Sequence, residues 1–180
     1  MGNLAATIGL LLSLLGVAVP SHPPLLGALA DAESPSDLSA AGFTDVVVPA
    51  SWSEIEPTEG SFSPIALTAL QTEIDADRAA GLHVTLDIGT QYAPPWVFGL
   101  PGGTRFVDQF GDVFTGGPGS GEDVANAVTD SAVRDVLVPY LFALGTLSDV
   151  SAVRLGGGPF NELRYPDGGQ GSEPCAFWFY

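Results

Sequence analysis

The chain has 180 residues, 46% of them apolar, which is enough for one domain with a hydrophobic core. It carries 21 acidic residues and only five basic ones, all arginine, so its net charge is −16. Such a surface repels nucleic acid and anionic membranes, and it suits a neutral ligand or a solvent rich in salt. The absence of lysine also excludes a phosphate-binding P-loop.

An apolar stretch opens the chain. Ile8–Leu15 has the length of the hydrophobic region of a signal peptide, and Gly16–Ala18 supplies small residues for cleavage. No lysine or arginine precedes it, and it is too short to span a bilayer. Export from the cell and retention in the cytoplasm therefore stay equally open.

The same region permits a second interpretation. Leu15–Val19 has the composition of a buried strand, with His22 at its carboxyl end. Both interpretations hold if cleavage falls before this strand. We therefore divide the chain into residues 1–14, a signal or disordered segment, and residues 15–180, one folded domain.

The next predicted unit is a short helix followed by a strand. Ser34-Pro35 supplies a cap and a proline at the first helical position, and Gly42 ends the helix. Residues 43–48 then read as a buried strand. Trp52 beyond it is either a packing residue or an aromatic surface for a ligand. For Glu56 we favour an acid at a helix start, where the helix dipole stabilises it.

Ser63-Pro64 predicts the start of a longer helix, and Gly81 its end. Its apolar positions recur near helical spacing, as expected of a surface helix that covers a sheet. These positions are Ile65, Leu67, Leu70 and Ile74.

His83–Gly89 is the next predicted strand. Asp87 lies within it, so we expect a buried structural acid paired with an arginine, for which Arg154 is the candidate. His83 begins the strand and is expected to be structural.

A glycine-rich loop over residues 99–121 precedes the last helix, which Asp130-Ser131 begins and Gly145 ends. The apolar positions of this helix form a stripe that faces a core. They are Val133, Val136, Leu137, Tyr140, Leu141 and Leu144. Residues 150–155 form the final predicted strand.

Neither a metal site nor a cofactor site is predicted. Cys175 is the only cysteine, so no internal disulfide can form. The two histidines are far apart in the sequence and have no cysteine near them. The glycine pairs at Gly119-x-Gly121 and Gly156-x-Gly158 lack the third glycine of a dinucleotide-binding loop.

Polar side chains follow the last predicted strand, after a run of glycines. They are Asn161, Glu162, Arg164 and Tyr165. Barrel enzymes keep their acids and bases just past the carboxyl ends of parallel strands. The local pattern leaves both a catalytic carboxylate and an ordinary solvated loop open.

The segment Gly158–Pro166 resembles the Gly-Pro-x-x-Glu-Leu-Arg-Tyr-Pro motif of the β-amylases. Asn161-Glu162 also resembles the Asn-Glu pair that ends strand four in the family 42 β-galactosidases. In both groups this glutamate donates a proton to the glycosidic oxygen. The resemblance implies that Glu162 is a proton donor, that Asn161 binds a sugar hydroxyl, and that Arg164 and Tyr165 orient the loop or the acid.

Weaker resemblances to these glycosidases extend over the preceding segments. They comprise the Trp-x-x-x-Glu-Pro pattern at residues 52–57, a Pro-x-Trp segment ending at Trp96, a Val-Asp-x-x-Gly run at residues 107–111, and an aromatic run at the end of the chain. The resemblance implies that aromatic side chains line a sugar site. The resemblance implies that the sugar contacts are four aromatic residues and one amide side chain. They are Trp52, Tyr92, Trp96, Trp178 and Gln91.

The alternation of strands and helices predicts an α/β fold with a parallel sheet, the first half of a (β/α)₈ barrel in about four βα units. A complete barrel takes about 250 residues. Both related mechanisms need a second carboxylate from later strands. We therefore expect a glycoside hydrolase acting on a neutral oligo- or polysaccharide, truncated before that residue, inactive alone, and able to associate with a missing C-terminal half. The alternative is a non-catalytic carbohydrate-binding barrel or an inactive fragment.

Overall fold

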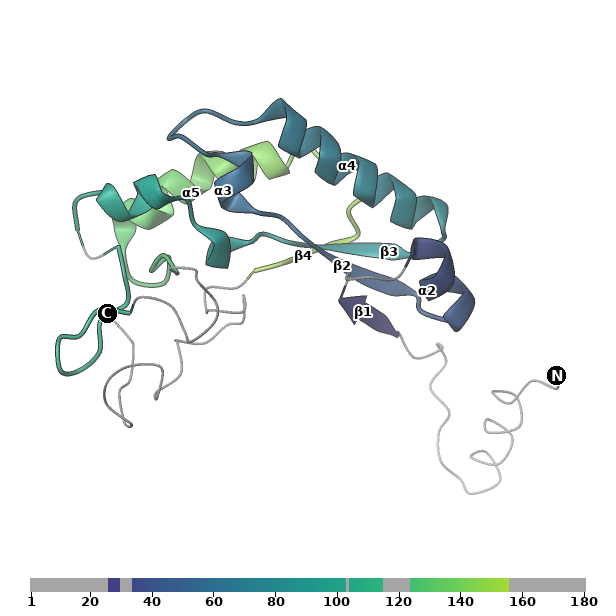
Figure 1. The fold of residues 1–180 in the computed structure, drawn as a ribbon, viewed down its shortest axis with the longest axis horizontal. Coiled ribbons are helices and arrows are strands. Elements are labelled where there is room, and N and C mark those ends of the chain that lie inside the picture. The colour runs from purple at the N-terminus through teal and green to yellow at the C-terminus, as the bar shows by residue number, and fades with distance from the viewer. Residues whose placement is uncertain (1–25, 30–33, 103, 115–123, 156–180) are drawn as a thin grey trace, which may run out of the picture.

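The structure, a computed structural model, describes residues 26–29, 34–102, 104–114 and 124–155. These residues form a parallel sheet of four strands in the order β1-β2-β3-β4 (Figure 1). The strands are β1 (Gly27–Leu29), β2 (Asp45–Pro49), β3 (His83–Asp87) and β4 (Ala152–Arg154). Each strand pairs with the next in sequence, so the predicted parallel βα fold is confirmed.

The first strand differs from the prediction. Gly27–Leu29 pairs with Asp45–Val47 and so occupies the edge of the sheet beside β2. The strand expected at residues 15–19 lies outside the described residues. A strand this short has no sequence signature of its own, because its conformation depends on pairing with β2.

The described helices are α2 (Pro35–Ala41), α3 (Trp52–Ile55), α4 (Pro64–Ala79) and α5 (Ser131–Leu144), with the 3₁₀ turns η1 (Thr90–Tyr92) and η2 (Pro95–Gly99). Helices α2, α4 and α5 begin directly after the predicted capping residues, whereas α3 was not predicted. The side chains of Ser34, Ser63 and Asp130 each accept a hydrogen bond from a backbone N–H of the first turn of α2, α4 and α5. None of the described helices is long and apolar enough to cross a membrane.

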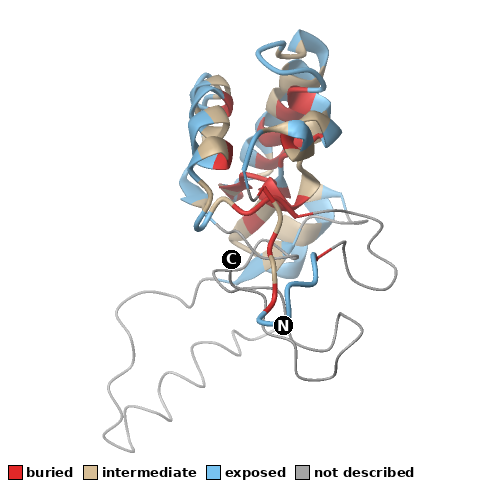
Figure 2. Cartoon of the chain, turned by 90° about the vertical axis from the view of Figure 1, so that its left-hand side faces the viewer, coloured by how far each residue is buried: buried red, intermediate tan, exposed pale blue. Residues whose placement is uncertain are grey.

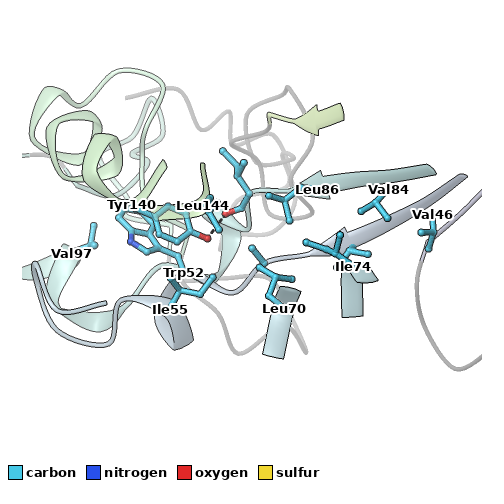
Figure 3. Packing of buried hydrophobic residues seen from close by; sticks show 14 of the residues in the cluster. Val46, Trp52, Ile55, Leu70, Ile74, Val84, Leu86, Val97, Tyr140 and Leu144 are labelled. Atoms are coloured by element: carbon cyan, nitrogen blue, oxygen red, sulfur yellow. Dashed lines mark hydrogen bonds between the residues drawn. The ribbon is translucent and has the colours of Figure 1, made fainter. Parts of the chain in front are cut away.

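The hydrophobic core lies between the sheet and the long helices. α4 and α5 lie on the same side of the sheet (Figure 1). Figure 2 shows the buried residues gathered along the sheet and on the helix sides that face it. Strands supply Val46, Val48, Val84 and Leu86, and helices supply Leu70, Ile74, Val133, Tyr140 and Leu144 (Figure 3). The predicted apolar stripe of the last helix is thus confirmed at its most buried positions.

The prediction that Ile65 belongs to the apolar face of the long helix was wrong. Its side chain is 84% exposed, so it does not belong to the apolar face of α4. In a helix of 3.6 residues per turn, Ile65 and Ile74 lie on opposite sides of the helix, about half a turn apart. Leu70 and Ile74, which lie one turn apart, do face the sheet.

The opposite face of the sheet carries the alternate residues of each strand. Val47 and Thr85, paired across β2 and β3, are half-buried there. The two edges of the sheet are more open, since Leu29 on β1 is 69% exposed and Val153 on β4 is 54% exposed. A sheet with long helices on one side and uncovered edge strands has the form of the first part of a (β/α) barrel.

Candidate functional site

A backbone hydrogen bond joins the chain segments at the carboxyl ends of β2 and β3. The Ala50 N–H donates to the Asp87 carbonyl at 2.8 Å. Gly89 follows with φ of 66°, and a Cβ added there would lie 1.8 Å from the Ala50 oxygen. Only glycine therefore fits at this position, and the close contact brings the two connections that leave these strands side by side.

Trp52 begins α3 directly after this contact. Its ring is fully buried and stacked on Tyr140, with ring centroids 5.3 Å apart (Figure 3). It also lies edge-on to Trp96, with centroids 6.1 Å apart. These contacts match the packing interpretation of Trp52. Contact between this ring and a sugar stays a prediction.

Tyr140 carries the contact into α5. Its hydroxyl donates to the Ile88 carbonyl at 2.7 Å. Burial raises the pKa of the Tyr140 phenol far above its usual range, and the negative charges of Asp87 and Glu56 raise it further. The hydroxyl is therefore a permanent hydrogen-bond donor that ties α5 to the end of β3.

Glu56 is not the helix-entry acid that we expected. It follows the last residue of α3 and is 1% exposed. Its Oε2 accepts from Trp52 Nε1 at 2.9 Å, its Oε1 accepts from the Gly60 N–H at 2.8 Å, and its backbone oxygen accepts from Trp96 Nε1 at 3.0 Å. The prediction was wrong because α3 ends, rather than begins, at this acid. The four-residue spacing of Trp52 and Glu56, one helical turn, was the available signal.

Asp87 is paired as predicted. Arg154 Nη1 lies 3.3 Å from Asp87 Oδ2 across β3 and β4, and the Gly89 N–H donates to Asp87 Oδ1 at 2.9 Å. The Asp87 residue is 3% exposed. At the other end of β3, His83 is exposed with Nδ1 3.8 Å from an oxygen of Asp45, which agrees with a structural role at the amino end.

The remaining described candidates follow β3. Gln91 lies in η1 and is 6% exposed, and its Oε1 atom is buried with no hydrogen-bond partner. Tyr92 and Trp96 are partly exposed. The structure thus places one acceptor oxygen without a partner and two accessible aromatic rings in the same connection.

The loop after η2 is packed rather than open over its described part. Phe106 and Phe114 are buried together with Val124. Asp108 Oδ1 accepts from the N–H groups of Phe110 and Asp112 at 2.9 and 2.8 Å, which fixes the turn. The described part of this loop therefore has a small core of its own.

The predicted proton donor and its neighbours lie outside the described residues. These are Asn161, Glu162, Arg164, Tyr165 and Trp178. Among the residues that the structure describes, no group of three or more His, Cys, Asp or Glu could hold a metal ion. The described part of the site thus consists of aromatic rings, Gln91 and two buried, hydrogen-bonded acids.

A parallel sheet with an aromatic cluster at the carboxyl ends of its strands is the arrangement of part of a (β/α) barrel. No protein-family model and no curated protein matches the chain. Solved structures do match, and three of them are compared with this chain below. The β-amylase catalytic domain from Paenibacillus polymyxa is 18% identical with a TM-score of 0.58, over 87% of this chain and 42% of that one.

A β-galactosidase from the psychrophilic Marinomonas ef1 is 20% identical with a TM-score of 0.58, over 73% of this chain and 21% of that one. An exo-β-1,4-mannosidase from an Opitutaceae bacterium is 16% identical with a TM-score of 0.51, over 72% and 24%. The chain spans less than half the length of each. It therefore has the fold of part of the barrel of these glycoside hydrolases.

Proposed function

We propose that this chain forms the proton-donor part of a glycoside hydrolase that acts on an O-glycosidic bond of a neutral oligo- or polysaccharide. One observation carries the proposal. β4 runs parallel to β3, so the carboxyl ends of the two strands lie at the same end of the sheet. Tyr92 and Trp96 belong to the connection that leaves β3 at this end. The motif with Glu162 follows β4 shortly afterwards in the sequence.

Glu162 is the proton donor in this proposal. A glycosidase uses two carboxyl groups, and one of them must be protonated to deliver its proton to the leaving oxygen. The second carboxylate comes from a C-terminal half of the barrel, which would also cover the open edges at Leu29 and Val153. Without that half, the chain is inactive.

The sugar is held by aromatic and polar side chains from several connections. Tyr92 and Trp96 offer accessible rings for the apolar C–H face of a sugar. Gln91 Oε1 is an unpaired buried acceptor, which a sugar hydroxyl would satisfy. The remaining proposed contacts are Trp52, Asn161, Arg164, Tyr165 and Trp178. The charge of −16 also favours a neutral rather than an anionic sugar.

The test needs the longest reading frame that contains this chain. A proton donor matters most for a poor leaving group, so we compare Glu162→Gln on a disaccharide and on its dinitrophenyl glycoside. Hydrolysis of the disaccharide should fall at least about 100-fold and that of the dinitrophenyl glycoside much less. Glu59→Gln, an exposed acid, is the matched control. Equal losses on both substrates, or a loss under tenfold on the disaccharide, would reject Glu162 as the donor.

The second candidate is a carbohydrate-binding protein without turnover. It is favoured by the accessible rings of Tyr92 and Trp96, which can hold a sugar without hydrolysis. Binding of an oligosaccharide that Trp96→Ala weakens, with no hydrolysis by any reading frame that extends the chain, would establish this alternative.

A further inference from the structure

Both carboxylate oxygens and the backbone oxygen of Glu56 accept hydrogen bonds. Each carboxylate oxygen accepts one N–H, from Trp52 and from Gly60, and its backbone oxygen accepts the indole N–H of Trp96. A buried carboxylate is costly unless its oxygens are satisfied, so this arrangement strongly constrains the groups around it. One residue therefore fixes two indole rings and the turn between α3 and α4.

The rings that meet at Glu56 differ in exposure. Trp52 and Tyr140 are fully buried, whereas Trp96 is partly exposed. Trp96 is held on two sides, by the edge-on contact with Trp52 at 6.1 Å and by the 3.0 Å bond to the Glu56 backbone oxygen. Its exposed surface is thus presented in one fixed orientation.

The geometry points to Glu56 as a positioning residue that orients the Trp96 ring for stacking on the apolar face of a sugar, an inference that rests on the proposed function. Glu56 does not touch the ligand. Its carboxylate holds Trp52 and the turn at Gly60, and this holds the backbone oxygen to which Trp96 donates. A ring fixed before binding loses less conformational freedom when the sugar stacks on it.

The test is a double-mutant cycle in the 180-residue chain. Glu56→Gln keeps the size of the side chain but presents an N–H₂ group to one of the two donors, so one hydrogen bond is lost. We measure the affinity for maltotetraose and for lactose in the parent, in Glu56→Gln, in Trp96→Phe and in the double variant. Glu54→Gln is the matched control, because Glu54 is an exposed acid of the same helix.

Glu56→Gln should weaken sugar binding about tenfold or more, which is at least about 1.4 kcal/mol. In the Trp96→Phe background it should cost nothing further, because no indole N–H remains for Glu56 to hold. A purely structural role would reduce affinity equally in both backgrounds. That result, or unchanged affinity in Glu56→Gln, would overturn the inference.

Two further measurements separate the possible failures. If the parent binds neither sugar, binding of these sugars by the 180-residue chain alone is rejected, the Glu162→Gln test still decides the proposed function, and the positioning role is decided by hydrogen exchange of the Trp96 indole N–H. Exchange at least about tenfold faster in Glu56→Gln supports the role, and unchanged exchange rejects it. If Glu56→Gln shows no cooperative melt, Trp52→Phe interrupts the same link from its other end, and the cycle with Trp96→Phe decides.

Discussion

Arg154 and Asp87 join β4 to β3 through a contact of 3.3 Å between Nη1 and Oδ2. The pair lies on the face of the sheet opposite α4 and α5, because Leu86, the neighbour of Asp87, points into the core below those helices. Asp87 is 3% exposed, so its charge is held almost without water. The pair therefore adds a side-chain contact to the backbone pairing of β3 and β4, where Asp87 and Arg154 are register partners.

Replacing Asp87 by Asn should lower the free energy of unfolding by about 1–3 kcal/mol, because Arg154 loses its charged partner while the side-chain volume is kept. Urea denaturation at neutral pH measures the change. Asp135→Asn, an exposed acid on α5, should stay within about 0.5 kcal/mol of the parent. Equal stability of the two variants would show that the pair contributes nothing.

Replacing Gly89 by Ala should prevent folding or destabilise the chain by more than about 3 kcal/mol, since the new Cβ would overlap the Ala50 carbonyl. Gly42→Ala is the matched control. Gly42 also has a positive φ, of 95°, but nothing lies within 4 Å of its added Cβ. That variant should lose only about 1 kcal/mol, and thermal melts of both proteins separate the steric effect from the backbone effect.

Asp77 on α4 makes stability depend on pH. Burial raises the pKa of its carboxyl above the ordinary value of 3.8, so the folded chain binds a proton more tightly than the unfolded chain does. The free energy of unfolding of the parent should therefore decrease as the pH rises from 3.8 through the raised pKa of Asp77 in the folded chain. Asp77→Asn lacks this loss, so its stability relative to the parent should increase between about pH 3 and pH 7.

Glu73 acts in the same direction. Burial and the negative charge of Asp77 both raise the pKa of Glu73, and Asp77→Asn removes the second cause. Urea denaturation of parent and variant over this pH range measures the effect. A stability difference that is constant with pH would contradict it.

Sodium chloride should raise the melting temperature, because the net charge of −16 leaves acidic side chains repelling one another and salt screens this repulsion. The melting temperature is followed from about 0.05 to 1 M salt. A variant carrying Glu59→Gln and Asp135→Asn, which removes two exposed charges, should show a shallower increase. A melting temperature that falls with salt would be the opposite result.

Local signals predicted most of the described fold. The cap and proline pairs at Ser34 and Ser63 depend only on neighbouring backbone N–H groups, so the sequence contains all that is needed to place α2 and α4. The partner of Asp87 was also predictable, because a buried acid needs a cation on an adjacent strand.

Features that depend on distant contacts were missed. Gly27–Leu29 is a strand only because β2 pairs with it. The contact between the Glu56 backbone oxygen and Trp96 could not be predicted, because Trp96 comes from another connection, whereas the Trp52–Glu56 contact had a local signal that was overlooked. The site residues Glu162 and Asn161 lie outside the described residues, so their assignment stays a proposal.

Tyr140 has a further consequence, for the way the chain folds. Its ring stacks on Trp52 and its hydroxyl bonds to Ile88, so one residue of α5 completes the surroundings of two earlier segments. The segments that contain Trp52 and Ile88 therefore cannot complete their native packing before α5 is present. In this they differ from the repeats of a solenoid, each of which packs only on its neighbours. A nascent chain released before α5 would leave the indole of Trp52 without its stacking partner and open to chaperones or to other chains.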